Sequence, residues 1–405
     1  MASLRSQAKN AFYARQHEVA YGFTRWDIRQ MPAAIRAPLM IVGAGPTGLA
    51  AALFLSRRGV PVRIIDAATQ PTTTSKALLV NPRTLEILGA YGVAARIIAE
   101  GYEVMGVTMH RGGREVVSID LQRELRSQLP IGLAQARTEA LLTEALQAKG
   151  VHVERGVTLQ TLQQDAEQVT LTLQQADGGT QTVQAPLVFG ADGARSAVRH
   201  ALGVDFAGDT LPEPWQLWDL RLRTSLDRQR AHIGLVPDGF LFLMHLQAGV
   251  WRVIGNGADP LAQLPGDSVA GEVQWQSQFH IAHRLADKFS VGRVALGGDA
   301  AHIHSPLGTR GMNLGIEDAW VFADCAVDAM AGKLERMQEY AELRQPVDRQ
   351  VVRNVAAITR LMRGRPPALR WLRDNLAPQA IKLAPVRRRL LQTMSGLDHP
   401  LRTRL

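Results

Sequence analysis

The sequence predicts an α/β fold in which a largely parallel sheet is interleaved with an antiparallel sheet and followed by C-terminal helices. Residues 39–65 have the pattern strand, glycine turn, helix, strand, which is the order of a βαβ unit. Residues 104–118 and 215–254 alternate apolar and polar side chains around turn sequences, which indicates antiparallel strands. After Pro346 the pattern becomes helical.

The first βαβ unit carries a Gly-x-Gly-x-x-Gly motif between its first strand and its helix. Gly43 permits a tight turn, Gly45 lets the backbone approach a pyrophosphate, and Gly48 lets the helix pack closely on the sheet. The phosphates would meet the unpaired N–H groups of the helix N-terminus. Asp66 ends the second strand, where it can accept hydrogen bonds from an adenosine ribose. These features predict a Rossmann-like dinucleotide site.

The middle of the chain adds a helix and another strand that leads into a glycine turn. Residues 138–149 have a helical period, and residues 151–173 have the pattern of strands. Residues 187–196 then form a strand, the pair Asp192-Gly193 and the start of a helix. Taken alone, this segment is an ordinary strand-to-helix connection.

A third glycine loop follows the apolar residues 294–296. This buried strand would deliver Asp299 to a loop whose glycines leave room for a flat ring system. The loop enters a helix near Met312, and the N-terminal amides of that helix would stabilise negative charge. A flavin suits this place because its reduced form is negatively charged at one edge of the ring.

The composition is that of an ordinary globular protein. The chain has 405 residues, of which 46% are hydrophobic and 20% are charged, so it can form one large or two closely packed domains. Its apolar runs fall far short of the roughly 20 residues needed to cross a bilayer, so no transmembrane helix is expected. The lone cysteine, Cys325, excludes an internal disulfide and fits a reducing compartment. A cytoplasmic location is therefore expected.

The formal net charge of +9 is unevenly distributed. Most of the excess lies after Asp348, where Arg and Lys residues face only Asp374 and Asp398. The charge does not coincide with a recognisable nucleic-acid-binding module, so no nucleic-acid partner is expected. A solvated helical face is the simpler interpretation. Weak peripheral contact of this basic C-terminal segment with an anionic membrane is the alternative.

The three motifs, in this order and spacing, resemble those of the group A flavoprotein monooxygenases, typified by para-hydroxybenzoate hydroxylase. Weaker matches lie at residues 75–88 and at Gln135 with Glu139, and the resemblance covers roughly residues 39–344. It implies an FAD-dependent monooxygenase that uses NADPH or NADH and O2. Such an enzyme hydroxylates an aromatic or other electron-rich small molecule through a C4a-hydroperoxyflavin.

The resemblance also implies roles for individual residues. Pro306 would lie beside the oxygen-reacting edge of the flavin. The residues implied in cofactor binding are Gly43, Gly45, Pro46, Gly48, Asp66, Lys76, Arg83, Gln135, Asp192, Gly298, Asp299, Gly308, Gly311, Met312 and Asn313.

Three positions depart from the pattern of that family. Lys76 stands where many members have arginine, which removes a bidentate phosphate contact. Thr309 replaces a usual glycine beside the ring, and Ala67 follows Asp66 where members often have arginine. The sequence also ends without the thioredoxin-like domain of the phenol hydroxylase branch, so a compact two-part architecture is expected.

The motifs divide the chain into alternating parts of an FAD-binding domain and a substrate domain. The expected FAD-binding parts are residues 38–103, 130–204 and 291–345. The expected substrate parts are residues 104–129 and 205–290, and the expected flanking parts are an N-terminal extension at 1–37 and a helical segment at 346–405. A monomer or a homodimer is consistent with this organisation.

The substrate is expected to lie between the flavin and the antiparallel sheet. Few tyrosines or arginines occur there, which favours a bulky hydrophobic molecule over a small charged benzoate. His245 is the candidate base for a substrate phenol. His302 and His304 have no third metal ligand nearby in the sequence, so no metal is expected. Lining candidates, for which a plain core role is the alternative, are Trp218, Ile233, Phe242, Met244, Leu246 and Trp251.

Two other interpretations remain open on the sequence alone. One is an FAD-dependent reductase or halogenase of the same fold, although the Trp-x-Trp-x-Ile-Pro signature of flavin halogenases is absent from residues 215–218. The other is a low-turnover flavoprotein scaffold that docks on a membrane through the basic C-terminal segment.

Overall fold

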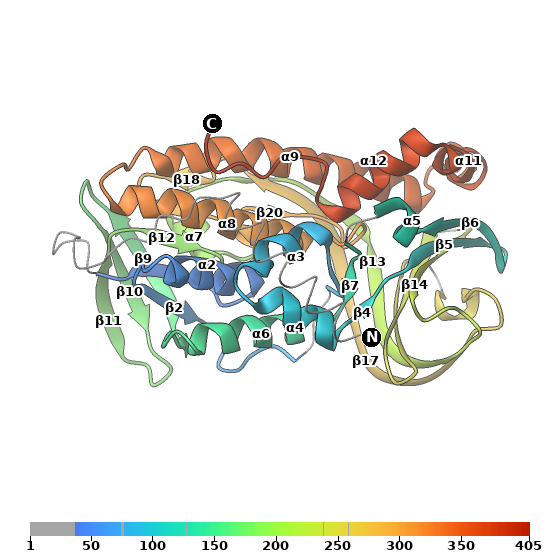
Figure 1. Cartoon of the computed structure of the whole chain (residues 1–405), viewed down its shortest axis with the longest axis horizontal. Helices are drawn as coiled ribbons and strands as arrows, with labels where there is room; N and C mark the ends of the chain where they lie inside the picture. The colour runs from blue at the N-terminus through green and yellow to red at the C-terminus, as the bar shows by residue number, and fades with distance from the viewer. Residues whose placement is uncertain (1–36, 74–76, 126–127, 238, 258) are drawn as a thin grey trace.

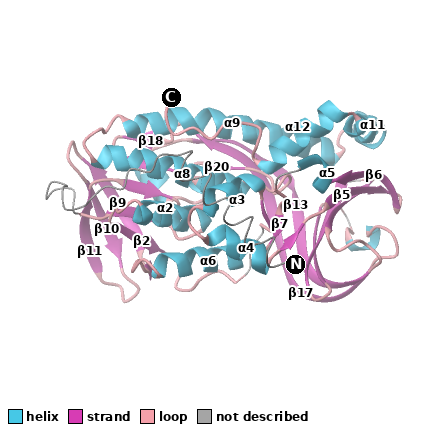
Figure 2. Ribbon diagram, viewed as in Figure 1, coloured by secondary structure: helices cyan, strands magenta, loops and turns pink. Residues whose placement is uncertain are grey.

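The computed structural model describes residues 37–73, 77–125, 128–237, 239–257 and 259–405. The parallel strands and most long helices occupy one half of the molecule, and the large antiparallel sheet occupies the other (Figures 1 and 2). The expected N-terminal extension, apart from its last residue, and Lys76 lie outside the described residues. Among the described helices, none combines the length and hydropathy of a membrane-spanning segment.

Six strands form the sheet of the first half, in the order β18-β19-β12-β1-β2-β8. The five strands from β19 to β8 run parallel, and β18 adds an antiparallel edge. The motif-bearing strands β19, β12 and β1 are therefore neighbours, so the three loops that follow them meet at one edge of the sheet. The strands are β1 (Leu39–Val42), β2 (Val62–Asp66), β8 (Val153–Arg155), β12 (Val188–Gly190), β18 (Ser290–Val291) and β19 (Val294–Leu296).

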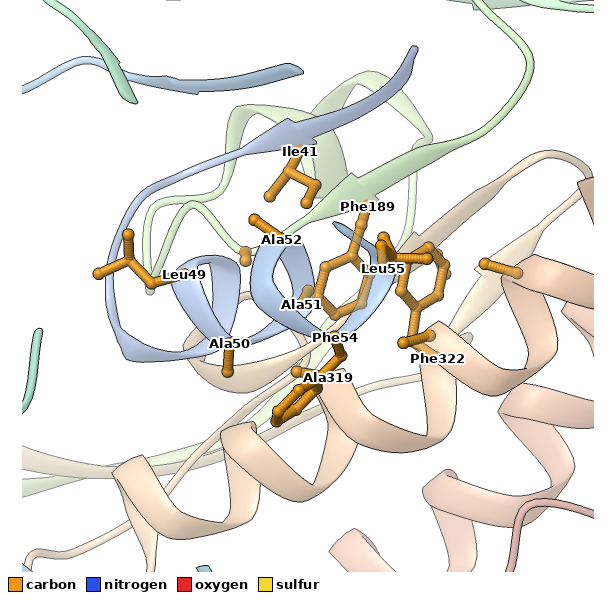
Figure 3. Close-up of a cluster of buried hydrophobic side chains, with 14 of the residues drawn as sticks. Ile41, Leu49, Ala50, Ala51, Ala52, Phe54, Leu55, Phe189, Ala319 and Phe322 are labelled. Atoms are coloured by element: carbon orange, nitrogen blue, oxygen red, sulfur yellow. The ribbon is translucent and has the colours of Figure 1, made fainter. Parts of the chain in front are cut away.

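Two buried helices, α2 (Pro46–Arg57) and α8 (Gly311–Met330), pack against each other beside this sheet. The small side chains from Ala50 to Ala52 are fully buried and allow this close approach. Phe189 of β12 stacks on Phe322 of α8 with ring centroids 4.1 Å apart (Figure 3). Burial of these apolar groups is the main favourable contribution to folding of this half.

Eight strands form the second half, in the order β20-β17-β13-β16-β15-β14-β5-β6. The long strands β13 and β17 pair along most of their length, and the far end of β17 pairs with β20, which lies within the third glycine loop, so they span both halves. The pair β14–β5 is parallel, whereas the other pairs are antiparallel as expected. The bounds are β5 (Gly106–Arg111), β6 (Arg114–Asp120), β13 (Phe206–Arg223), β14 (Arg230–Val236), β15 (Gly239–Gln247), β16 (Val250–Gly255), β17 (Val269–Ala286) and β20 (His302–Ile303).

Shorter elements complete both halves. One three-stranded sheet consists of β9 (Thr158–Gln164), β10 (Val169–Gln174) and β11 (Thr180–Ala185). Another consists of β3 (Leu79–Val80), β4 (Tyr102–Glu103) and β7 (Ile131–Gly132). The remaining helices before the C-terminal part are α3 (Pro82–Gly89), α4 (Val93–Glu100), α5 (Leu121–Leu125), α6 (Gln135–Gln147), α7 (Ala197–Ala201), η3 (Leu261–Gln263) and η4 (Gly298–Ala300).

The C-terminal helices begin earlier than the sequence predicted. Helix α9 (Arg336–Arg363) contains Pro346, so the expected boundary at 345/346 falls inside a continuous helix. Proline removes one helical hydrogen bond, but the ion pair of Arg344 with Asp348 and packing on α8 hold the helix together across it. The following helices are α10 (Pro367–Trp371), η5 (Leu372–Leu376), α11 (Ala377–Lys382) and α12 (Ala384–Ser395).

A buried network of charged side chains joins α8 to α9. Arg344 donates to Asp318 and to Asp348, both at 2.8 Å, and its guanidinium is almost completely buried. His302 contacts Asp318 at 2.7 Å. Asp318 also accepts a hydrogen bond from the backbone N–H of Gly298 at 2.9 Å, which fixes the start of the third glycine loop. These groups are shielded from water, so each charge depends on the opposite charges beside it for compensation.

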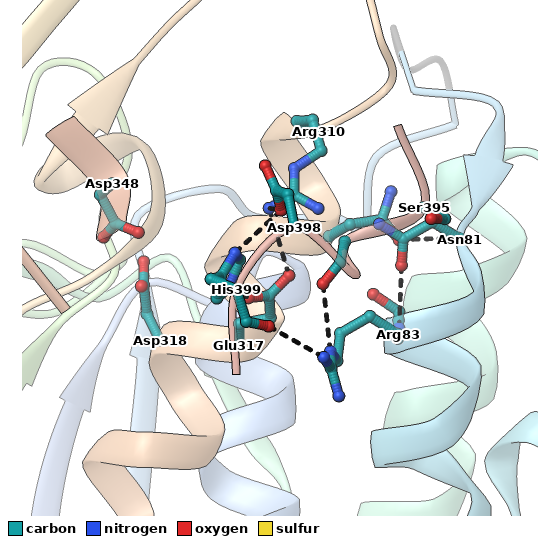
Figure 4. A network of polar contacts seen from close by, with 12 residues as sticks. Asn81, Arg83, Arg310, Glu317, Asp318, Asp348, Ser395, Asp398 and His399 are labelled. Atoms are coloured by element: carbon teal, nitrogen blue, oxygen red, sulfur yellow. Dashed lines mark hydrogen bonds and ion pairs between the residues drawn. The ribbon is translucent and has the colours of Figure 1, made fainter. Parts of the chain in front are cut away.

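A second part of the network attaches the end of the chain to α8 (Figure 4). His399 contacts Glu317 at 2.7 Å, and Arg310 lies 3.6 Å from Glu317 and 3.8 Å from Asp398. The backbone carbonyls of Gly396 and His399 accept hydrogen bonds from Arg83. The segment after α12 is therefore held against the N-terminal end of α8.

The network predicts that the protein loses stability as the pH rises above neutral. Burial lowers the pKa of His302, but the carboxylates of Asp318 and Asp348 outweigh that effect and raise it to about 9. The stabilisation is complete below the unfolded pKa near 6.5 and is lost as the pH rises through the folded pKa. We expect the free energy of unfolding to fall by on the order of 2 kcal/mol between pH 7 and pH 10 from this residue.

Chemical unfolding of the parent and of His302→Gln at several pH values measures this contribution. The variant should be less stable at pH 7 and should show a shallower decline toward pH 10. Parallel declines in the two proteins would contradict a protonated His302 in the folded state.

Candidate functional site

The first glycine motif has the geometry that a bound phosphate requires. Gly43 has φ +101°, and a Cβ there would lie 2.3 Å from the carbonyl oxygen of Ala191. A Cβ at Gly48 would lie 1.9 Å from the carbonyl oxygen of Gly43, which would separate α2 from the strand. At Gly45, in contrast, a Cβ would meet no atom within 4 Å. Packing within the protein does not explain Gly45, so the space before the N-terminus of α2 is available for phosphates.

Asp66 lies at the end of β2 and connects this turn to the neighbouring loop. Its carboxylate accepts hydrogen bonds from the backbone N–H groups of Ala44 at 2.6 Å and Ala68 at 2.8 Å. Arg155 approaches it to 3.6 Å. Each carboxylate oxygen can accept a further hydrogen bond, so Asp66 is compatible with a ribose as well as with its role in the turn.

The third loop is packed onto the first motif. Gly298 has φ +58°, and a Cβ there would lie 2.4 Å from the Thr47 hydroxyl oxygen. A Cβ at Gly315 of α8 would lie 2.2 Å from the same atom. Gly298 therefore allows loop, α8 and α2 to meet, while Asp299 is exposed at the same edge.

A cavity of about 460 Å³ lies between the third loop, the antiparallel sheet and α12. Cavities of this size hold drug-sized ligands or part of a larger one. Pro306, Gly308, Gly311 and Met312 line it from the loop and from the first turn of α8, together with Gln135 and Asp299. The sheet contributes an apolar wall formed by Val107, Trp215, Ile233, Phe240, Phe242, Ile254 and Phe279, and Val104 extends it just before β5.

The sheet has two apolar faces, and only some predicted substrate residues face the cavity. Ile233 and Phe242 line it. Trp218 and Trp251 belong to a separate apolar cluster with Leu241 and Leu243, on the opposite face. Side chains alternate between faces along a strand, and the sequence pattern did not identify which face encloses the site. The predicted lining role of these two tryptophans is therefore corrected.

The remaining substrate candidates on β15 do not line the cavity either. Met244 and Leu246 lie on the same face as Phe242 but pack within the apolar cluster of the sheet. The His245 ring makes an edge contact with Trp251, with ring centroids 5.5 Å apart. His245 therefore faces away from the cavity, which is contrary to the role of substrate base expected from the sequence.

Three residues expected to bind the cofactor use their side chains within the protein. Arg83 donates to the carbonyls of Gly396 and His399 near the C-terminus. Asp192 accepts hydrogen bonds from the Ser196 hydroxyl at 2.5 Å and from a backbone N–H of α7. The Asn313 amide bonds the backbone at residues 79, 81 and 309. Most of these partners are distant in the sequence or belong to the helix that follows, so the sequence motifs did not indicate the structural roles of Arg83, Asp192 and Asn313.

The cavity wall also contains two polar groups, His304 and Thr309, which the sequence analysis named without assigning either to the cofactor or the substrate. His304 Nδ1 lies 2.9 Å from the carbonyl oxygen of Ser305. A carbonyl can only accept a hydrogen bond, so Nδ1 carries the proton and Nε2 of the neutral ring is an acceptor. Burial lowers the pKa of His304 to about 3, which keeps the ring neutral. Thr309 has φ +56°, a left-handed conformation that costs energy for a β-branched residue. No local pattern would have revealed either feature except the replacement of a glycine by Thr309.

His302 does have further potential metal ligands, contrary to the expectation from sequence spacing. Asp318 and Asp348 bring ligand atoms within 4.8 Å of its ring nitrogen. Arg344, however, donates to both carboxylates and supplies the compensating positive charge. The arrangement is accounted for as an ion network that holds the third loop.

Comparisons with known proteins agree with this geometry. The sequence profile of the FAD binding domain family matches residues 36–236 and 261–355. A 6-methylpretetramide 4-monooxygenase of Streptomyces rimosus is 35% identical over 400 residues, which cover 90% of this chain and 70% of that protein. A pentachlorophenol 4-monooxygenase of Sphingobium chlorophenolicum is 31% identical over 353 residues, which cover 81% of this chain and 65% of that protein.

Solved structures show the same architecture. The anhydrotetracycline hydroxylase OxyS from Streptomyces rimosus superposes with a TM-score of 0.74 at 30% identity, covering 90% of this chain and 76% of that one. The p-nitrophenol 4-monooxygenase PnpA from Pseudomonas putida has a TM-score of 0.82 at 23% identity, covering 89% and 98%, and supports the fold. The resemblance inferred from the three motifs is confirmed, and the chain belongs to the FAD binding domain family as an FAD-dependent monooxygenase.

Proposed function

We propose that this enzyme takes electrons from NADPH or NADH, consumes O2 and hydroxylates an uncharged, largely apolar aromatic molecule. The observation that carries the proposal is the cavity of about 460 Å³ that the third glycine loop and one apolar face of the sheet enclose together. Relatives are named as monooxygenases of 6-methylpretetramide and pentachlorophenol, which supports an aromatic substrate for this chain as well.

The charges around the cavity favour a neutral substrate. Among the described residues of its lining, none is Lys or Arg, and the carboxylate is that of Asp299 at the cofactor edge. A carboxylate substrate would lose its hydration without gaining a cation, which is costly in an apolar site. An apolar aromatic molecule would instead gain from burial against Phe242 and Ile233.

The residues of the sheet edge fit the two halves of FAD. We assign its diphosphate to the turn from Gly43 to Gly48, which includes Pro46, and its ribose to Asp66. Asp299 and Gln135 lie where the cavity meets this edge, and we assign them to the chain that links nucleotide and ring. FAD, when bound there, supplies the redox chemistry that activates O2.

The ring end of the cavity has donors and acceptors that suit a flavin. The first-turn amides of α8, at Gly311 and Met312, have no carbonyl partners within the helix and favour negative charge. His304 Nε2 can accept a hydrogen bond throughout the working pH range because the ring stays neutral. Gly308 leaves space beside the ring, and Pro306 presents no N–H donor there. The apolar wall excludes water from the reacting atoms.

Several broader expectations belong to the same proposal. The buried, single Cys325 is consistent with a cytoplasmic enzyme. We assign residues 38–103 and 130–204, together with the third glycine loop and α8, to cofactor binding, and residues 104–129 and 205–290 to the substrate sheet. The oligomeric state is proposed to be a monomer or a homodimer, with weak membrane contact through the C-terminal segment.

Substrate-stimulated turnover tests the proposed reaction. The FAD-loaded enzyme, mixed with NADPH under isotopically labelled O2, should oxidise NADPH faster when a fitting phenol is added. One labelled oxygen atom should appear in the product, as measured by mass spectrometry. Faster NADPH oxidation with no labelled product from any phenol, neutral or charged, would refute the hydroxylase assignment.

The choice of sheet face gives a second prediction. Phe242→Ala should raise the KM for an apolar substrate roughly tenfold, because a buried aromatic contact is lost. Leu226→Ala removes an apolar side chain from the cluster on the opposite face and serves as the matched control. We expect the control to lower stability without changing KM. Equal effects of both variants on KM would place the substrate elsewhere.

A further inference from the structure

The helices after α9 expose large apolar side chains to solvent. Trp371 is 59% exposed and Leu376 is 48% exposed, while Leu383 and Val386 at the start of α12 are 60% and 42% exposed. These residues come from α10, η5 and α12 and from the turn that joins α11 to α12. Large apolar side chains that are exposed in this way are candidates for an interaction surface.

The opposite side of the same helices is firmly attached to the sheet. Arg373 is buried and donates to the carbonyls of Val236, Gly239 and Met362. Arg387 pairs with Glu124 at 2.8 Å. The exposure of the apolar side chains is therefore a property of a fixed surface and does not result from a detached segment.

Basic residues alternate with these apolar residues along the same stretch of sequence. Asp374 is the one acidic residue in the sequence from 365 to 389, and its carboxylate accepts a hydrogen bond from Arg373 at 2.7 Å. Arg388 and Arg389 also line a surface groove between α9 and α12 together with Gln350 and Asn354. The exposed basic side chains of this stretch are Arg365, Arg370, Lys382, Arg388 and Arg389.

We propose that residues 365–389, which we call the docking surface, bind the enzyme to an anionic lipid membrane. Apolar side chains would enter the interface while the surrounding cations meet anionic headgroups. Tryptophan is well suited to this position because its ring is apolar and its N–H can bond to the headgroup region. A symmetric contact with a second copy fits less well, because it would bring the same positive rims together.

The location of the docking surface links it to the cavity. Val386, Arg388 and Arg389 of α12 are exposed, and Leu391 and Met394 further along the same helix line the cavity. Docking would therefore hold the cavity close to a phase in which apolar molecules dissolve. This consequence rests on the proposed substrate class, whereas membrane binding itself does not.

Sedimentation with lipid vesicles tests the docking surface. The full-length, FAD-loaded protein should bind vesicles that contain about one third phosphatidylglycerol and should bind pure phosphatidylcholine vesicles much more weakly. About 0.5 M NaCl should release most of the protein, because salt screens exposed charges. The double variant Trp371→Ser/Leu383→Ser should lower the partition coefficient at least about tenfold.

A matched control uses exposed apolar residues elsewhere. Val269 and Val273 on β17 are 48% and 43% exposed, so Val269→Ser/Val273→Ser removes exposed apolar side chains outside the docking surface. This control should bind anionic vesicles like the parent. Equal loss in both double variants, or no preference of the parent for anionic vesicles, would overturn the proposal.

Self-association provides a decisive alternative outcome. The parent could fail to bind vesicles and instead be a dimer in sedimentation equilibrium that Trp371→Ser/Leu383→Ser converts to a monomer. That result would make the surface an interface between copies of the chain, and the proposal would be wrong. FAD content and substrate-stimulated NADPH oxidation should be unchanged in that variant. Failure of membrane binding is thereby distinguishable from failure of the proposed hydroxylase function.

Discussion

The adjacency of β1, β12 and β19 in one parallel sheet is the constraint on which the rest of the site depends. Parallel strands end at the same edge, so three loops from distant parts of the sequence are brought together there, and a backbone hydrogen bond from Gly297 to Gly190 joins the third segment to the second. Thr47 then fills the space left by two glycines, Gly298 and Gly315, and locks the first loop to the third. An extended dinucleotide can contact this edge from its phosphates to its ring.

The buried ion network between α8 and α9 fixes the position of the third loop. Asp318 holds the backbone of Gly298 and is itself held by Arg344 and His302. Removal of one partner would leave an uncompensated charge in the interior, which typically costs about 3–5 kcal/mol. The same network reaches the end of the chain through Glu317 and His399. The edge of the sheet that carries the glycine loops is therefore linked by buried polar contacts to α9 and to the segment that follows α12.

Local geometry explains which features the sequence could predict. The glycine turns, the first βαβ unit and the antiparallel strands depend on neighbouring residues, so their patterns were sufficient. Phe242 and Trp218 could not be distinguished, because alternation defines two faces without saying which one encloses a ligand. The roles of Arg83 and Asn313 depend on partners more than 200 residues away in the sequence. Likewise, Pro346 indicated a helix start because the packing of α9 on α8 and the buried contact of Arg344 with Asp318 were not visible in the local pattern.

Gly45 gives the most direct test of the claim that the three loops bind FAD. A side chain at this position would enter open space in the protein but would occupy the place assigned to the diphosphate. We predict that Gly45→Val leaves the unfolding midpoint of the apoprotein close to that of the parent and weakens FAD binding at least about tenfold in an equilibrium titration, since each tenfold is about 1.4 kcal/mol. A folded Gly45→Val protein that binds FAD as tightly as the parent would contradict the account.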